Sequence, residues 1–182
     1  MPYSPGLRRS SYPGIKMSID FNPEGVVSRG EAVPQSLSAV YIHLVFSTKH
    51  RYPFLRDSGL RKDLHAYLGS SSKNLECPPL LVGGVEDHVH LLARFGRTIT
   101  QAEWVKELKR VSNLWLKEEA GLRQFSWQGG YADFSVSQSN VDKVKKYIAN
   151  QERHHRKITF QDEVRGLLTK HCIEWDERYI WD

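Results

Sequence analysis

The stretch PPLLVGGVEDHVHLLARF, residues 78–95, consists of two apolar runs with a short polar break between them. Both runs are rich in Leu and Val and are too short for a typical helix, so each predicts a β-strand. Residues 85–87 predict a tight turn, and the Gly83–Gly84 pair predicts a bulge or a close backbone approach. The stretch therefore predicts a hairpin whose second strand carries His88 and His90.

Alternating strand and helix patterns flank this hairpin. Before it, residues 39–48 are β-branched and aromatic, as in a strand covered on both faces. Leucines at helical spacing then predict a helix that begins near residue 58 and stops at Gly69. After the hairpin, a capping box at Thr100 predicts an amphipathic helix. Residues 125–137 predict a strand with a turn.

Two more helices are predicted near the C-terminus. Residues 140–155 carry an apolar stripe of one continuous helix, and a capping pattern at Thr159 opens a short one. The residues 173–182 would dock as a final strand or hook. The order strand–helix–strand–strand–helix–strand–helix–helix predicts an α+β, ferredoxin-like (split βαβ) fold. It is an antiparallel sheet sandwiched by helices, with extra C-terminal helices.

Composition and charge narrow the class of protein. With 40% hydrophobic and 26% charged residues, the chain reads as globular. Residues 36–182 would form the domain, and residues 1–35, rich in Pro, Gly and Ser, an irregular or disordered extension. The sequence offers no membrane span and no signal peptide, so we expect a cytoplasmic protein. Cys77 and Cys172 match neither a metal motif nor a disulfide framework, and we expect reduced thiols.

The net charge of +5 is compatible with a nucleic-acid partner without requiring one. Its distribution is more informative, because Lys and Arg gather in residues 143–157. Such a cluster is either a solvated helix face or a surface that contacts phosphates.

His88 and His90 are the first candidates for chemistry. Alternate residues of a strand share a face, so the two imidazoles would lie roughly 7 Å apart and could hold one cation. The pair alone is a weak signal for a metal site, because chance and satisfied core histidines often produce the same pattern. A cupin would need a carboxylate soon after, which residues 91–95 lack, and a zinc hydrolase would need a second ligand motif that His43, His50 and His65 do not form.

The segment KKYIANQ, residues 145–151, offers a second half for the site. Tyr147 and Gln151 are four residues apart, so on one helix they share a face. A tyrosine there packs at the edge of the core or acts as a nucleophile, which a divalent metal would assist by polarising the phosphorus. The Gln151 amide oxygen would be a third ligand, and the set suits Mg²⁺ or Mn²⁺.

Five segments together resemble one protein family. They are HLVFSTKHR (43–51), GGVEDHVHLL (83–92), FSWQGGYADFSVS (125–137), KKYIANQERHHRK (145–157) and ERYIWD (177–182). They resemble the single-tyrosine, His-hydrophobic-His transposases (TnpA-like) of small bacterial insertion sequences that move as single-stranded DNA. The resemblance implies that His88, His90 and Gln151 hold the metal and that Tyr147 is the nucleophile.

The resemblance also implies a mechanism and partners. The enzyme would bind a DNA hairpin near each transposon end, and Tyr147 would attack a single-stranded phosphodiester to give a 5′-phosphotyrosine and a free 3′-OH. Another 3′-OH would then reseal the strands without ATP. The protein would be a nucleoid-associated homodimer with composite active sites. The candidates for DNA contacts are Lys106, Lys109, Arg110, Lys143, Lys146, Arg153 and Lys157.

Two other functions remain open at this point. A domesticated relative would bind hairpin DNA without transposing, although the intact set of four residues argues against lost chemistry. A metal hydrolase acting on small phosphoesters would have no need of Tyr147 and no preference for DNA hairpins.

Overall fold

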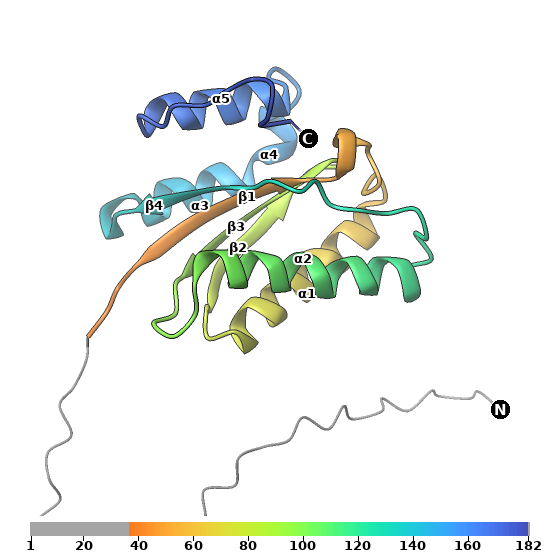
Figure 1. The fold of residues 1–182 in the computed structure, drawn as a ribbon, viewed down its shortest axis with the longest axis horizontal. Helices are drawn as coiled ribbons and strands as arrows, with labels where there is room; N and C mark the ends of the chain where they lie inside the picture. The colour runs from red at the N-terminus through yellow and green to blue at the C-terminus, as the bar shows by residue number, and fades with distance from the viewer. Residues whose placement is uncertain (1–36, 182) are drawn as a thin grey trace, which may run out of the picture. The chain divides into compact units, whose positions relative to one another are not determined.

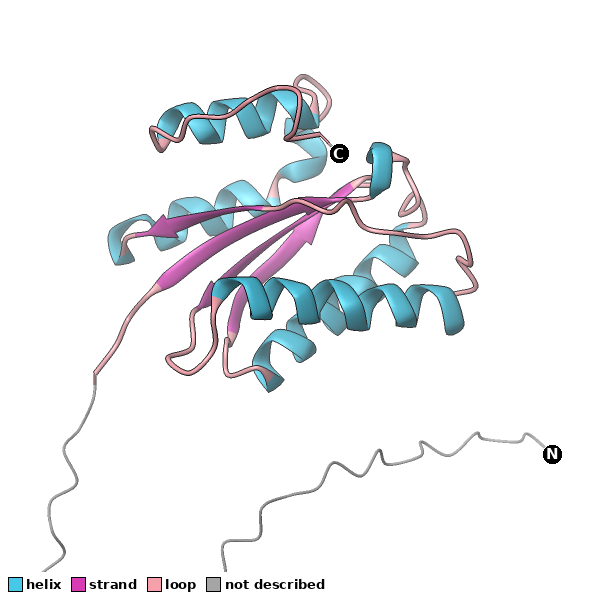
Figure 2. Cartoon of the chain, viewed as in Figure 1, coloured by secondary structure: helices cyan, strands magenta, loops and turns pink. Residues whose placement is uncertain are grey.

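The computed structural model describes residues 37–181, and the predicted extension of residues 1–35 lies outside this part of the chain. Four strands form one antiparallel sheet in the order β2-β3-β1-β4. They are β1 (Tyr41–Ser47), β2 (Pro79–Gly84), β3 (His88–Arg94) and β4 (Ala132–Val136). Helices cover both faces of this sheet (Figure 2). The predicted ferredoxin-like α+β fold is confirmed.

The helices divide between the two faces (Figure 1). One face carries α1 (Ser58–Asn74) and α2 (Gln101–Glu118). The other carries α3 (Val141–Ala149), α4 (Gln151–His154) and α5 (Phe160–Lys170). Two 3-10 turns, η1 (Lys49–Arg51) and η2 (Gln138–Asn140), follow β1 and β4. None of the helices within residues 37–181 is long and apolar enough to cross a membrane.

Alternation along the strands produces two different cores. Leu44, Val89 and Leu91 point toward α1 and α2 and belong to the main hydrophobic core. The alternate residues of the same strands point to the other face of the sheet. There α3 packs on Leu92 and α5 packs on Val45. The histidines of β3 lie on this second face, so helices α3 to α5 cover them.

The two glycines at the end of β2 permit two close approaches. Gly84 has φ 149°, and a Cβ there would lie 2.3 Å from the His88 carbonyl oxygen. A Cβ on Gly83 would lie 2.7 Å from Cγ2 of Ile148 in α3. The predicted close approach is therefore present, whereas the irregularity in strand register lies earlier, between Pro79 and Leu81.

Two predicted helices have different ends in the structure. Helix α1 continues through Gly69 to Asn74, because the Gly69 position packs on β2 without requiring a positive φ. The predicted helix of residues 140–155 is interrupted at Asn150, whose φ and ψ are −106° and 18°. The Asn150 amide donates to the Tyr147 carbonyl, three residues back, which closes α3. Tyr147 and Gln151 therefore do not share one continuous helix.

The remaining differences concern the strand-like segments. Within residues 125–137, only Ala132–Val136 form a strand, and Trp127 pairs with Thr48 in a single bridge. Residues 173–176 have no regular structure and residues 177–181 form turns, so the segment is not a strand. The Ile180 carbonyl accepts a hydrogen bond from Gln128, which ties this segment to the body of the domain. Cys77 and Cys172 are both free, as expected.

Candidate metal centre and tyrosine site

His88 and His90 lie side by side on β3 with their ring centroids 5.0 Å apart. Neither has any solvent exposure. Val89, between them, is buried in the core on the opposite face of the sheet, as the alternation predicted. The two imidazoles are therefore fixed by the strand and enclosed by the helices above it.

A third imidazole, that of His155, packs against His88 with ring centroids 4.5 Å apart. In each of the three rings, the Nδ1 atom is already engaged. It contacts Asp87 Oδ1 at 2.6 Å in His88, His43 Nε2 at 2.9 Å in His90, and the Ile158 carbonyl at 2.9 Å in His155. The Nε2 atoms are consequently the ones left to face a shared partner.

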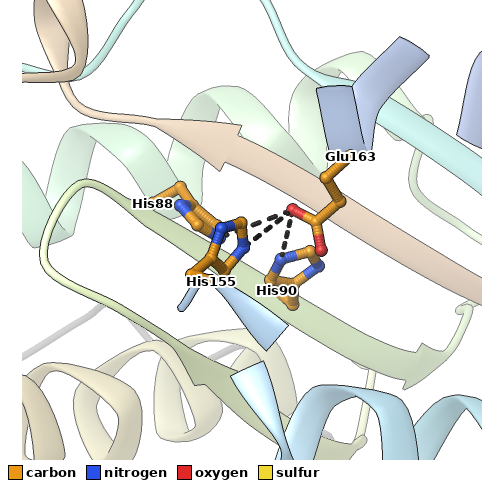
Figure 3. A group of neighbouring side chains, drawn as sticks. All are labelled: His88, His90, His155 and Glu163. Atoms are coloured by element: carbon orange, nitrogen blue, oxygen red, sulfur yellow. Dashed lines mark ion pairs between the residues drawn. The ribbon is translucent and has the colours of Figure 1, made fainter. Parts of the chain in front are cut away.

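That shared partner is the carboxylate of Glu163 (Figure 3). Its Oε2 atom lies 3.6 Å from Nε2 of His88, 3.4 Å from that of His90 and 3.2 Å from that of His155. Glu163 is placed there by α5, in which Phe160 and Val164 bury the same helix face. Burial alone would raise the pKa of Glu163, but its contacts with His155 and His90 outweigh burial and hold the pKa well below its usual range.

Burial and the neighbouring Glu163 act in opposite directions on the pKa values of the histidines around the site. Burial lowers the pKa of His90 to about 4, against the opposing effect of Glu163. Burial, helped by His90, also lowers the pKa of His43 to about 3. Both rings are therefore neutral. Burial acts to lower the pKa of His155 too, but the contact with Glu163 raises it overall.

The donor set fits a divalent metal ion. His88, His90, His155 and Glu163 each offer one ligand atom, and these four atoms lie within 4.8 Å of one another. Within residues 37–181, Nε2 of His90, Nε2 of His155 and Oε2 of Glu163 make no hydrogen bond. Buried polar atoms are rarely left unpaired, and neutral imidazole nitrogens with a carboxylate are ordinary ligands of divalent ions.

Tyr147 and Gln151 meet this cluster from α3 and α4. The Tyr147 hydroxyl donates a hydrogen bond to Glu163 Oε1, and the Gln151 amide nitrogen donates to the same oxygen at 2.9 Å. The Gln151 amide oxygen lies 3.4 Å from His88 Nε2. The structure thus brings together all four residues that the sequence singled out. Burial, with the negative charge of Glu163, raises the pKa of Tyr147.

The predicted basic residues separate into two groups. Four of them surround a cleft of about 610 Å³ that Tyr147 also lines: Lys143, Lys146, Arg153 and Lys157. The other three, Lys106, Lys109 and Arg110, line a cleft of about 460 Å³ on the α2 side of the sheet.

Lys109 and Arg110 are also engaged within the protein. The Lys109 ammonium donates to the carbonyl oxygens of residues 128–130, and Arg110 pairs with Glu107 at 2.6 Å. Only the first group lies beside the tyrosine.

The sequence reasoning missed three residues of the cluster: His43, His155 and Glu163. His43 was considered as a ligand and set aside, yet it holds Nδ1 of His90. His155 lies within the basic segment of residues 143–157, and no spacing in that segment distinguishes it as a ligand. Glu163 could have been found from the sequence, because it lies in the apolar stripe of its helix, three residues after Phe160 and one before Val164. A carboxylate at such a position predicts a buried charge that needs a partner.

Comparisons with known proteins concern the fold and the family of the chain. Among proteins of curated function, none matches the sequence. A crystal structure of a candidate transposase from Deinococcus radiodurans is 21% identical, with a TM-score of 0.51 over 66% of this chain and 97% of that one. A REP-associated tyrosine transposase bound to a REP hairpin is 12% identical, with a TM-score of 0.50 over 69% of this chain and 73% of that one. Both show the same fold.

The family match is more specific than the fold. The IS200-like transposases match residues 36–151, which is most of the domain and includes His88, His90, Tyr147 and Gln151. The chain belongs to the family of IS200-like transposases.

Proposed function

We propose that this transposase cleaves and rejoins single-stranded DNA at insertion-sequence ends through a 5′-phosphotyrosine on Tyr147. The observation that carries the proposal is that the Tyr147 hydroxyl donates to Glu163 beside His88, His90 and Gln151, while Tyr147 also lines a cleft surrounded by basic residues. A tyrosine nucleophile, a metal-binding cluster and a cationic surface are the parts that this chemistry requires.

Each residue has a defined role in the proposed reaction. His88, His90 and Gln151 would hold Mg²⁺ or Mn²⁺, which when bound polarises the scissile phosphate and offsets its developing charge. Lys143, Lys146, Arg153 and Lys157 would hold the DNA backbone in the cleft.

Glu163 Oε1 already accepts the Tyr147 proton in a hydrogen bond, so it is placed to take that proton as the phenol oxygen attacks phosphorus. The attack breaks the bond from phosphorus to the 3′-oxygen, which takes up the proton that Tyr147 gave to Glu163 and leaves as a 3′-OH. In the reverse sense, a 3′-OH attacks the phosphotyrosine, rejoins the DNA and releases Tyr147.

The proposed partners are a DNA hairpin near each transposon end and a second copy of the chain. The hairpin is supported by the REP hairpin bound to the relative described above. Because the substrate is chromosomal DNA, the protein would act in the bacterial cytoplasm, at the nucleoid.

A covalent adduct tests the proposal directly. The protein is incubated with Mn²⁺ and a single-stranded oligonucleotide that carries a candidate transposon end, and the mixture is denatured and separated by size. We expect a denaturation-resistant protein–DNA adduct that is absent in Tyr147→Phe and in His90→Ala. Tyr41→Phe is the matched control, because Tyr41 packs in the same small hydrophobic cluster as Tyr147. Cleavage that survives Tyr147→Phe would refute the mechanism, and hairpin binding without any adduct would favour the domesticated relative.

The composite homodimer has its own test. His90→Ala and Tyr147→Phe proteins are each expected to be inactive, and they are mixed under conditions that allow subunits to exchange. If Tyr147 serves the partner's metal centre, the mixture regains adduct formation. If the mixture stays inactive while the protein is dimeric by sedimentation, the composite active site is wrong.

A further inference from the structure

We propose that His155 and Glu163 are metal ligands in addition to His88, His90 and Gln151, so that three imidazoles, one carboxylate and one amide oxygen hold the ion. The inference rests on the proposed function and extends its ligand set. Both added residues lie beyond residues 36–151, the stretch that matches the family.

The first argument is the direction of the three imidazoles. Histidine ligands of metals usually have their second ring nitrogen held by a carboxylate, a carbonyl or another polar group, which fixes the ring and its tautomer. All three rings have this arrangement at Nδ1, through Asp87, His43 and the Ile158 carbonyl. His155, although it comes from outside the sheet, is held in the same way as the two strand histidines.

The second argument is that the two carboxylate oxygens of Glu163 have different partners. Oε1 accepts hydrogen bonds from Tyr147 and Gln151. Oε2 makes no hydrogen bond within the described part of the chain and faces the three Nε2 atoms at 3.2 to 3.6 Å. A carboxylate that is only 5% exposed loses its hydration, so an oxygen left in this way is suited to an ion.

The donor set also indicates which ion. Imidazole nitrogens suit divalent transition metals, whereas Mg²⁺ prefers oxygen ligands and retains several waters. Three imidazoles with one carboxylate therefore favour Mn²⁺ over Mg²⁺. An ion with six positions would still keep one for a phosphate oxygen after these four ligands and Gln151 are bound.

The test measures Mn²⁺ binding directly, through the loss of the paramagnetic resonance signal of free Mn²⁺. We expect Glu163→Gln and His155→Asn each to weaken the affinity for Mn²⁺ by at least about tenfold, the lower limit for a residue that supports a metal site. A smaller loss in either variant overturns the assignment of that residue. Competition should show weaker binding of Mg²⁺ than of Mn²⁺, and equal binding would overturn the choice of ion.

Matched controls separate ligation from general damage. Glu118→Gln removes an exposed carboxylate at the end of α2, on the other face of the sheet. His50→Asn removes an exposed imidazole, and Asn tolerates the positive φ of that position. Both controls should bind Mn²⁺ as the native protein does, and circular dichroism without metal should show all four variants folded.

A measurement on the native protein is independent of variant folding. Pulsed paramagnetic resonance of bound Mn²⁺ counts the coordinated imidazole nitrogens, and three are expected where His88 and His90 alone would give two. If Mn²⁺ binding depends on Glu163 and His155 but Tyr147→Phe still cleaves DNA, the proposed function fails and this inference stands. If the adduct forms at Tyr147 but the affinity for Mn²⁺ is unchanged in Glu163→Gln and His155→Asn, the proposed function stands and this inference fails.

Discussion

The contact between Gly83 and α3 makes the position of Tyr147 sensitive to a single methyl group. In Gly83→Ala, the new Cβ would lie 2.7 Å from Ile148 Cγ2 and 3.0 Å from the Ile148 carbonyl oxygen. Carbon atoms prefer about 3.5–4.0 Å, so α3 must move by about 1 Å. A side-chain rotation cannot relieve the clash, because one of the two atoms belongs to the backbone.

The displaced residue is the neighbour of the nucleophile, so stability and chemistry should both suffer. Overpacking of this kind costs about 1–3 kcal/mol in the free energy of unfolding. A shift of about 1 Å in a reacting group lowers the rate by up to about 100-fold. We therefore expect Gly83→Ala to form the Tyr147 adduct about 10- to 100-fold more slowly than the native protein.

A second glycine supplies the control. A Cβ on Gly69 would lie 3.6 Å from Pro79 Cγ and 3.7 Å from Val82 Cγ2, which are ordinary contacts. Because Gly69 lies inside α1, Gly69→Ala should raise the free energy of unfolding by about 0.5–1 kcal/mol and leave the adduct rate unchanged. Urea unfolding followed by tryptophan fluorescence measures the first quantity, and single-turnover adduct formation the second. If Gly83→Ala were as stable and as fast as the native protein, the contact between β2 and α3 would not be what positions Tyr147.

Three further substitutions test other parts of the structure. Asp87→Asn weakens the partner that orients His88, so the affinity for Mn²⁺ should fall about 10- to 100-fold by calorimetry, and an unchanged affinity would contradict the role of Asp87. Lys109→Met leaves the carbonyls of residues 128–130 without their donor and should cost about 1–3 kcal/mol in urea unfolding, where a neutral result would mean that water replaces the ammonium. Lys146→Ala should reduce the slope of log affinity against log salt for single-stranded DNA by about 0.7, and an identical slope would remove Lys146 from the DNA surface.

The sequence predicted the fold and half of the cluster because both depend on local periodicity. Strand alternation is enough to place His88 and His90 on one face and Val89 on the other. The order of the elements, read from turn and capping residues, leads to the ferredoxin-like sheet. The segment KKYIANQ and then the family resemblance indicated Tyr147 and Gln151, and the structure brings both to the two histidines.

The rest of the cluster depends on packing between distant segments. The helix is interrupted at Asn150, which changes the direction of the chain after Tyr147. The apolar stripe of residues 140–155 does not predict this interruption. Glu163 reaches His90 only because α5 folds back over the sheet, and their separation of 73 positions has no local signature. The expected stop at Gly69 failed for a related reason, since tertiary packing of α1 on α2 and β2 overrides the weak helix propensity of one glycine.

Nε2 of His90, Nε2 of His155 and Oε2 of Glu163 make no hydrogen bond within the described residues, and this also has a thermodynamic consequence. Folding removes these atoms from water without giving them a hydrogen bond in return, which costs free energy in the folded state. An ion that binds only the folded chain offsets this cost, so its concentration would govern the folded population as well as the reaction rate. The supply of transition metal in the cell would then set how much competent transposase exists, before any DNA is encountered.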